Sequence, residues 1–340
     1  MAGSLDGKVA IVTGAGRGLG RVMTLGLLDA GACVAAVELD GPALEETRDA
    51  AEDRGGGERL NGIVADVTWN DSGPKILRAT TERFGRVDIL LNNAGTNIGL
   101  LRREGRPRGK LWETTPEEFR RIIEVNVVAA FLMTRAVLPA LLAQRWGRII
   151  NVTTSLDVMW RGMMQPYGAS KAANEAMLAA LAQELDGTGV TANVLVQGGA
   201  ADTRMVSRTA VPDRSTLIAP EAMVEPLIWL CSNASDCVNG QRFIAAKWDA
   251  KVPPEQAMKN AAAPAAWQQL GRQSINPDGL LWRLRVCRNA ALHGIGESFV
   301  SNAAVGSDRQ YFAQARFDLR DLVGRQRRQR LARGADRQAA

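Results

Sequence analysis

The stretch that decides the fold is Val9–Gly20, which reads Val-Ala-Ile-Val-Thr-Gly-Ala-Gly-Arg-Gly-Leu-Gly. A short apolar run, typical of a buried strand, leads directly into a cluster of glycines and then into an amphipathic helical pattern. Glycines in such a turn let the backbone bend tightly and approach a pyrophosphate without a Cβ in the way. The helix that follows would offer free N–H groups to the phosphates. Strand, glycine turn and helix together predict a nucleotide site, whereas a glycine cluster alone is also typical of a surface turn. The candidate cofactor contacts in this stretch are Gly14, Arg17, Gly18, Leu19 and Gly20.

Apolar runs and helical patterns alternate over most of the chain. The runs predict strands near Val9–Thr13, Cys33–Glu38, Leu60–Ala65, Val87–Asn92, Arg148–Thr153, Val190–Val196 and Arg242–Ala245. Helices are predicted notably at Leu19–Ala30, Pro116–Gln144, Tyr167–Leu185 and Pro220–Ser232, with Thr115, Pro116 and Glu118 forming a helix start. This alternation is typical of a doubly wound (Rossmann) α/β fold, so we expect a seven-stranded parallel sheet with helices on both faces.

The net charge of +6 is concentrated at the C-terminal end. Residues 281–340 hold 12 arginines, no lysine and 5 acidic residues, a net of +7 that leaves −1 for residues 1–280. The regular alternation also stops after about Trp248. We therefore expect a dinucleotide-binding and catalytic domain over residues 1–250 and an irregular extension over residues 251–340, partly disordered or peripheral and Arg-rich from residue 281. An amphipathic helix and an RNA-binding arm are the alternatives for this extension.

Several other site classes are disfavoured by composition. The single histidine, His293, lies far from every motif, so a Ser–His–Asp triad or a histidine-rich metal site is not expected, and we predict no metal. Four widely spaced cysteines indicate reduced thiols, and no apolar signal segment precedes the first strand, which favours a cytoplasmic protein. The longest apolar stretch, Val127–Ala143, contains Arg135 and Pro139, so we interpret it as a buried or interface helix and not as a membrane span.

A phenol and an ammonium are brought together at the start of one predicted helix. Tyr167 and Lys171, in Tyr-Gly-Ala-Ser-Lys, are four residues apart and hence on one helical face. A free tyrosine titrates near about 10, and a neighbouring cation lowers its pKa by stabilising the phenolate. The lysine would therefore make this tyrosine useful as an acid or base near neutral pH, although the spacing alone is more often a surface pair.

With these motifs in order, residues 5–250 resemble the short-chain dehydrogenase/reductase family. Thr13, Gly14, Gly18 and Gly20 match its TGxxxGxG turn, and Asn92-Asn93-Ala94-Gly95 matches its NNAG stretch. Asp66-Val67 is similar to the family's adenine-side pair, and Asn126 is similar to its active-site helix asparagine. The resemblance adds the following candidate cofactor contacts to those of the glycine turn: Asp66, Val67, Asn93, Ala94, Gly95, Tyr167, Lys171, Gly198 and Thr203.

The resemblance implies hydride transfer between a nicotinamide cofactor and a secondary alcohol or ketone. Tyr167 would exchange a proton with the substrate oxygen, and Lys171 would lower the tyrosine pKa and bind the nicotinamide ribose. Asn126 would hold a water that links Lys171 to solvent. Its other interpretation is a polar core residue that kinks the helix.

The acidic residue after the second strand bears on the cofactor. Glu38 lies about 20 residues after the turn, where a carboxylate would accept hydrogen bonds from the adenine ribose and repel the extra phosphate of NADP. Arg17 beside the turn argues for NADP, because a guanidinium could pair with that phosphate. We favour NAD, with NADP as the alternative.

The sequence departs from the family pattern in three places. The substrate-orienting hydroxyl is either Thr154, by ungapped counting, or Ser155, by residue identity, with a slight preference for Ser155. Gln197-Gly198 replaces a Pro-Gly after the sixth strand, which puts cofactor affinity in doubt. Leu100–Lys110 is a longer, Arg-rich loop, either a solvated loop or a lid over an anionic substrate.

Two further hypotheses belong to other classes. The chain could be a cofactor-sensing binding protein with weak or no turnover, or a nucleic-acid binder through its arginine tail, which we consider less favoured. The family resemblance implies a homo-oligomer, a dimer or tetramer, formed through the long helices, and the predicted helices at Pro116–Gln144 and Tyr167–Leu185 are apolar enough for this. A predicted apolar substrate wall consists of Met159, Trp160, Met163 and Met164.

Overall fold

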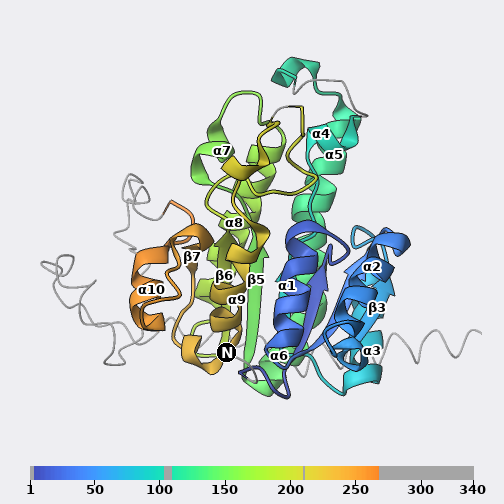
Figure 1. The fold of residues 1–340 in the computed structure, drawn as a ribbon, viewed down its shortest axis with the longest axis vertical. Helices are drawn as coiled ribbons and strands as arrows, with labels where there is room; N and C mark the ends of the chain where they lie inside the picture. The colour runs from blue at the N-terminus through green and yellow to red at the C-terminus, as the bar shows by residue number, and fades with distance from the viewer. Residues whose placement is uncertain (1–3, 103–108, 210, 268–340) are drawn as a thin grey trace, which may run out of the picture. The chain divides into compact units, whose positions relative to one another are not determined.

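The glycine turn lies at the carboxyl end of β1 (Val9–Thr13), inside an eight-stranded sheet of order β3-β2-β1-β4-β5-β6-β7-β8 (Figure 1). The computed structural model describes residues 4–102, 109–209 and 211–267. Strands β1 to β7 are parallel and β8 pairs antiparallel with β7. The other strands are β2 (Cys33–Glu38), β3 (Leu60–Val64), β4 (Ile89–Asn92), β5 (Gly147–Val152), β6 (Val190–Val196), β7 (Gln241–Ile244) and β8 (Ala262–Pro264).

The doubly wound parallel sheet predicted from the sequence is confirmed, with strand ends shifted by at most two residues. The eighth strand was not predicted. It follows α10 (Pro254–Ala261), so the sheet continues past residue 250, where we expected the domain to end. Pro254 opens α10 at a position where its missing N–H is not needed, and the proline of β8 lies on an edge strand. The rest of the predicted extension, from residue 268, lies outside the described residues.

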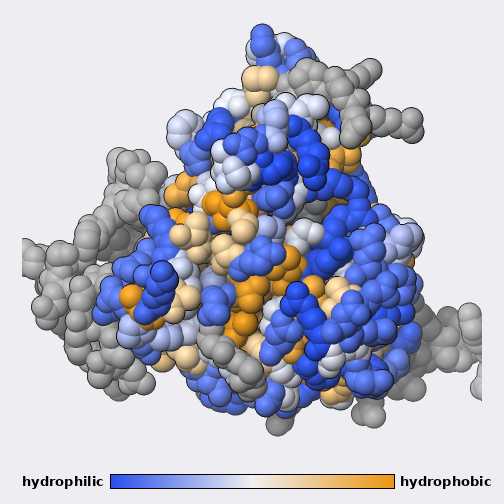
Figure 2. Space-filling view, viewed as in Figure 1, coloured by the Kyte–Doolittle hydropathy of each residue, from blue (hydrophilic) through white to orange (hydrophobic). Residues whose placement is uncertain are grey.

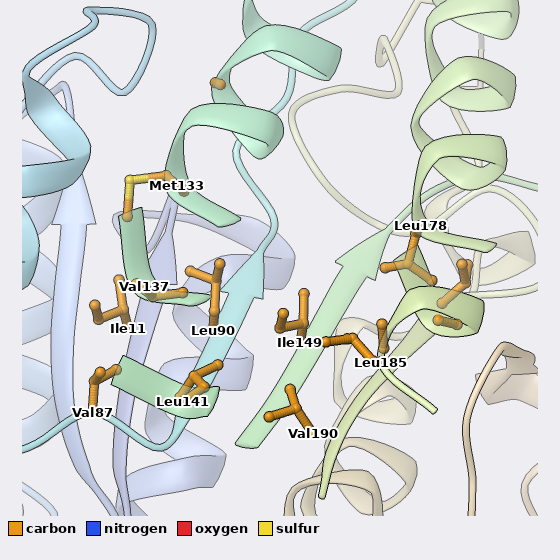
Figure 3. Close-up of a cluster of buried hydrophobic side chains, with 14 of the residues drawn as sticks. Ile11, Val87, Leu90, Met133, Val137, Leu141, Ile149, Leu178, Leu185 and Val190 are labelled. Atoms are coloured by element: carbon orange, nitrogen blue, oxygen red, sulfur yellow. The ribbon is translucent and has the colours of Figure 1, made fainter. Parts of the chain in front are cut away.

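Helices cover both faces of the sheet. On one face lie α1 (Gly18–Asp29), α2 (Gly41–Glu52) and α9 (Val224–Cys231), and on the other lie α3 (Ser72–Phe84), α6 (Ala129–Gln144) and α8 (Tyr167–Glu184). Figure 3 shows Met133, Val137 and Leu141 of α6 and Leu178 beside the strands, where they form the core of the second face. Figure 2 shows hydrophobic side chains in the middle of the first face, over α1 and α9, surrounded by hydrophilic ones.

One long helix runs from Pro116 to Gln144. It consists of α5 (Pro116–Ile123), the π-helical turn η3 (Glu124–Val128) and α6, and Thr115 caps it as expected, accepting from the Glu118 N–H at 3.2 Å. By length and composition alone it could cross a membrane, with a mean hydropathy of 1.9 in its most apolar window and 33% of that window buried. Its outer face carries Phe131 at 48% exposure, and the oligomer that we expect on this face stays a prediction.

Short elements complete the described part. They are η1 (Gly57–Arg59), α4 (Ile98–Leu101), η2 (Leu111–Glu113), α7 (Leu156–Trp160), η4 (Arg214–Thr216), η5 (Pro220–Met223), η6 (Asn233–Ser235) and η7 (Ala245–Lys247). The predicted helix Pro220–Ser232 is therefore η5 followed by α9.

The strand order positions the site. From β1 the chain winds outward to β2 and β3, and it then returns to pair β4 against the other edge of β1. The loops after β1 and β4 therefore leave the sheet in opposite directions, and ligands of open α/β sheets bind in the crevice formed there. A cleft of about 710 Å³ lies at this end of the sheet, a size that suits a cofactor or small ligand.

Candidate active site

The glycine turn forms one wall of this cleft. Gly14, Arg17, Gly18, Leu19 and Gly20 all line it. Gly18 has φ +52°, which favours glycine, and a Cβ on Gly20 would lie 1.9 Å from the carbonyl oxygen of Gly14, so the helix can pack this tightly only without a side chain. The residue before α1, Arg17, makes no side-chain cap, which leaves the first N–H groups of the helix available to an anion.

The NNAG stretch locks the end of β4 to this turn. The Asn93 side chain donates to the carbonyl oxygens of Thr13 and Gly14, at 3.0 and 3.1 Å. The Thr13 hydroxyl in turn accepts from the backbone N–H groups of Asn93 and Ala94, at 3.0 Å each. These residues therefore hold the two sides of the crevice together, while Asn93, Ala94 and Gly95 line the cleft.

The acidic end of β2 faces the same turn. One Glu38 oxygen accepts from the Gly16 N–H at 3.0 Å, and the other accepts from the N–H of Leu39 at 2.8 Å. A Cβ on Gly16 would lie 2.6 Å from the Glu38 side chain, so this position requires glycine. We did not predict this requirement from the sequence. Arg17 forms an ion pair with Asp40. Asp40 also lines the cleft, which we did not predict from the sequence. The backbone N–H of Ala43 and the Arg17 guanidinium hold the pKa of Asp40 below its usual value.

Asp66 and Val67 line the cleft beyond β3. Asp66 accepts from the N–H and the hydroxyl of Thr68, at 2.9 and 2.6 Å, and its other oxygen lies 3.3 Å from the Arg121 guanidinium. Burial favours the neutral acid, but the hydrogen bonds from Thr68 and the charge of Arg121 outweigh it, so the pKa of Asp66 is lowered. Arg121 comes from α5, and no local pattern in the sequence links it to Asp66.

Tyr167 and Lys171 project from the first turns of α8 into the cleft. The Lys171 ammonium nitrogen lies 5.9 Å from the centre of the Tyr167 ring, and its one hydrogen bond within the described residues is to the Val152 carbonyl oxygen at 2.9 Å. Lys171 is 4% exposed, and burial lowers its pKa to about 8. A Cβ on Gly95 would lie 3.3 Å from this ammonium, so the last glycine of the NNAG stretch leaves room for the lysine.

Thr154 and Ser155 follow β5 and both line the cleft. Thr154 is 5% exposed, and Ser155 immediately precedes α7. Neither hydroxyl makes a hydrogen bond within the part of the chain that the structure describes, so both can meet a ligand. The geometry therefore leaves the choice between the two candidates open.

Asn126 lies in η3, beneath the cleft and 1% exposed. Its side chain accepts from the Thr96 N–H at 2.8 Å and donates to the Thr96 carbonyl and to the Ser170 hydroxyl, at 2.9 and 2.8 Å. Its backbone carbonyl accepts from the Asn174 side chain at 2.7 Å. These contacts fix the π-helical turn against α8, as expected for a polar residue that distorts a helix, while the water-holding role stays a prediction.

The loop after β6 closes over the glycine turn. Gly198 and Thr203 line the cleft, and the Thr203 methyl would lie 3.2 Å from a Cβ on Gly18. Gln197, which stands where the family has proline, keeps its loop paired through a hydrogen bond from the Ala246 N–H to its carbonyl at 3.0 Å. Its side-chain oxygen is buried and has no partner among the described residues, so a bound group with an N–H would satisfy it.

The remaining wall is mostly apolar. Gly168 of α8 donates its N–H to the Met164 carbonyl at 2.8 Å, which places the loop after α7 next to the Tyr167 turn. Of the four predicted wall residues only Met164 lines the cleft, since Met159 is buried and Trp160 and Met163 are exposed. The larger apolar residues of this wall are Leu100, Leu101, Val158, Met164, Met205 and Val206, and its charged residues are Asp157, Arg161 and Arg204.

The Arg-rich loop is described only at its ends. Arg102 forms an ion pair with Glu118 at 2.7 Å and donates to the Glu113 carbonyl at 2.8 Å, so it ties the loop to α5. Arg103, Arg106 and Arg108, on which the lid hypothesis depends, lie outside the described residues. Among the residues that the structure describes, no group of three or more His, Cys, Asp or Glu is arranged to hold a metal.

Comparison with known proteins identifies the family of the chain. The family model described as short chain dehydrogenase matches residues 8–212. A 3-oxoacyl-(acyl-carrier-protein) reductase of Thermotoga maritima is 30% identical over 70% of this chain and 95% of its own length. A 2-dehydro-3-deoxy-D-gluconate 5-dehydrogenase of Escherichia coli is 30% identical over 70% and 93%. The solved structure of a short chain dehydrogenase from Pseudomonas syringae has a TM-score of 0.65 at 30% identity, covering 72% of this chain and 97% of the other.

Proposed function

The chain belongs to the short-chain dehydrogenase/reductase family and is an NAD(P)-dependent oxidoreductase, and we propose that it interconverts a secondary alcohol and its ketone with Tyr167 as the general acid and base. The observation that carries the proposal is the buried Lys171 ammonium beside the Tyr167 ring, in the cleft that the glycine turn opens. A cation at this position favours the phenolate over the phenol. Tyr167 can then take a proton from an alcohol or return it to a ketone oxygen near neutral pH.

The residues of the cleft fit a dinucleotide. The cradle at Gly18 and Gly20 and the uncapped start of α1 would hold the pyrophosphate, and Asp66 with Val67 would line the adenine. Within the described residues two N–H groups of Lys171 and the side-chain oxygen of Gln197 have no partner, so the first could bind ribose hydroxyls and the second suits the amide of a nicotinamide. When bound, the cofactor supplies or accepts the hydride at C4 of its nicotinamide.

We propose that NAD is preferred over NADP. Glu38 and Asp40 both line the cleft at the end of β2, where a ribose phosphate would meet two carboxylates. Arg17, the residue that argued for NADP, is ion-paired with Asp40 and is therefore partly neutralised. A ribose with free hydroxyls, by contrast, can donate to the Glu38 carboxylate.

The substrate should be a ketone or alcohol attached to an apolar group. Six larger apolar side chains line the wall that includes the loop after α7, and Arg161 in that wall is paired with Asp157. Thr154 or Ser155 would donate to the substrate oxygen opposite Tyr167. The two relatives named above act on an acyl thioester carrier and on a sugar acid, according to their names, so the substrate differs between members of similar identity.

The test uses the fact that the chain has only two tyrosines, Tyr167 and Tyr311. We expect Tyr167→Phe to lower kcat by a factor of about 100 or more across ketones with apolar groups, while NADH still binds. Tyr311→Phe, in the C-terminal tail, is the matched control and should keep full activity. Turnover that survives in Tyr167→Phe would refute the proposal, and a wild type that binds NADH but reduces no ketone would favour the cofactor-sensing alternative.

A readout without substrate is also available. Tyr311→Phe leaves Tyr167 as the one tyrosine of the chain, so its tyrosinate absorbance against pH reports the ionisation of Tyr167 directly. We expect the pKa of Tyr167 to rise when Lys171→Met is added, because the ammonium that stabilises the phenolate is lost. An unchanged titration would show that the lysine does not act on the tyrosine.

A further inference from the structure

A second charged pair lies beneath the cleft and takes no part in the chemistry proposed above. Glu175 is on α8, one helical turn after Lys171, and is fully buried, and Arg242 is on β7 with 3% exposure. The Arg242 guanidinium and the Glu175 carboxylate form an ion pair. Neither residue lines the cleft, so neither side chain contacts a ligand there directly.

The pair is attached to the end of β5. The Thr153 hydroxyl donates to Glu175 at 2.8 Å, and the second arm of the Arg242 fork donates to the Thr154 carbonyl oxygen. The preceding carbonyl, of Val152, accepts from Lys171. Three consecutive residues, which themselves line the cleft, are therefore held by α8 and β7 immediately before Ser155, the residue that precedes α7.

The C-terminal side of the sheet completes this cluster. The Ala266 N–H, just after β8, donates to the second Glu175 oxygen at 3.2 Å. Both carboxylate oxygens and both arms of the guanidinium therefore have partners from four separate segments. Such a fully partnered network holds its members in one arrangement.

Stability alone does not account for a buried ion pair. Removing two charges from water costs several kcal/mol each, and apolar residues of similar volume often replace such pairs with no loss or with a gain. The arginine fork, however, does what an apolar residue cannot do, because it grips a carboxylate and a carbonyl in fixed relative positions. The property that calls for an explanation is therefore the fixed position in which Arg242 holds the Glu175 carboxylate and the Thr154 carbonyl.

We propose that Glu175 and Arg242 are positioning residues: through Thr153 and the Thr154 carbonyl they fix the backbone that presents the hydroxyls of Thr154 and Ser155 to the substrate. This inference rests on the proposed function for its kinetic consequence, while its structural consequence can be measured separately. A misplacement of reacting groups by about 1 Å can lower the rate by about 100-fold, so a local loosening is sufficient to matter.

The chain offers a matched control. Arg148, at the other end of β5, is 1% exposed and likewise contacts a carboxylate, of Asp236, together with the backbone carbonyls of Gly147 at 3.0 Å and Ser232 at 3.1 Å. Arg242→Lys keeps a cation for Glu175 but lacks the planar fork that also reaches Thr154, and Arg148→Lys makes the same chemical change far from the cleft. A double variant, Glu175→Leu with Arg242→Met, keeps the buried volume without charges and serves where the lysine variant fails to fold.

Two measurements on the full chain decide the matter. We expect Arg242→Lys to lower kcat by about 10- to 100-fold with the Kd for NADH unchanged, and to speed amide hydrogen exchange over residues 153–160. Arg148→Lys should change neither. The inference is overturned if exchange over residues 153–160 stays at the wild-type rate in both the lysine and the double variant, or if Arg148→Lys lowers kcat equally. If the wild type reduces no ketone, the proposed function fails, and the exchange rates still decide this inference.

Discussion

Replacing Lys171 by methionine is expected to make the protein more stable at neutral pH while it abolishes turnover. The ammonium of Lys171 is 4% exposed, and burial lowers its pKa from 10.5 to about 8. A lysine whose pKa is lower in the folded protein than in the unfolded chain opposes folding at every pH at which the unfolded chain still binds the proton. Methionine has a similar length and carries no charge, so it removes this cost and keeps most of the packing.

The size and the sign of the effect follow from the two pKa values. Below about pH 8 both states are protonated and the folded state bears the whole cost, which at roughly 1.36 kcal/mol per pH unit is about 3 kcal/mol. Between about pH 8 and 10.5 the folded protein releases the proton first, so its stability rises with pH. The lost hydrogen bond to Val152 offsets about 1 kcal/mol, which leaves a net gain of about 2 kcal/mol for Lys171→Met at neutral pH.

The assay is urea unfolding of both proteins without cofactor, at about pH 7 and at about pH 10. The advantage of Lys171→Met should be present at the lower pH and should vanish or reverse at the higher one, because only the wild type gains from deprotonation. Lys247→Met removes an exposed lysine and should show no pH-dependent difference. A free-energy difference that does not change with pH, or a Lys171→Met protein that is less stable at neutral pH, would refute the reasoning.

Two further predictions concern the cleft. Asp40→Asn should raise the ratio of kcat/KM with NADP to kcat/KM with NAD by about 10-fold, because Arg17 loses its ion pair and becomes available to the ribose phosphate, while asparagine can still cap α2. Initial rates with both cofactors measure this ratio, and an unchanged ratio would show that the Arg17–Asp40 pair does not determine cofactor preference. Of Thr154→Ala and Ser155→Ala, the one that removes the substrate-orienting hydroxyl should lower kcat/KM by about 100-fold and the other by much less; equal losses would contradict a single orienting group.

The parts of the site that the sequence predicts are those coded by local chemistry. Gly14, Gly18 and Gly20 are needed because a backbone turn and a helix start come into contact, and that requirement is visible in neighbouring residues. Tyr167 and Lys171 meet because they are one turn apart on one helix. All the predicted cofactor contacts line the cleft, and all but Thr203, which lies further along the loop after β6, follow the carboxyl end of a predicted strand or stand in the first turns of a helix.

The parts that could not be predicted depend on pairs far apart in the chain. Arg121 meets Asp66 across 55 residues and Arg242 meets Glu175 across 67, and nothing near any of these residues identifies its partner. Strand β8 escaped notice because its three residues, Ala-Ala-Pro, have no strand pattern of their own and pair only because β7 offers a free edge. Tertiary context decides such contacts, and a periodic pattern cannot reveal them.

Helix α8, which carries Tyr167 and Lys171, has no clear amphipathic pattern. Its first half buries polar side chains, Tyr167, Lys171, Asn174 and Glu175, against the ends of the strands, and its second half buries Leu178 and other apolar groups in the core. The inner face therefore changes from polar to apolar along its length, which weakens any average over the helix. The apolar half stabilises the docking of α8 and so offsets the cost of the buried lysine. Substitutions of the buried apolar residues in the second half should consequently lower stability, whereas Lys171→Met should raise it at neutral pH and remove function.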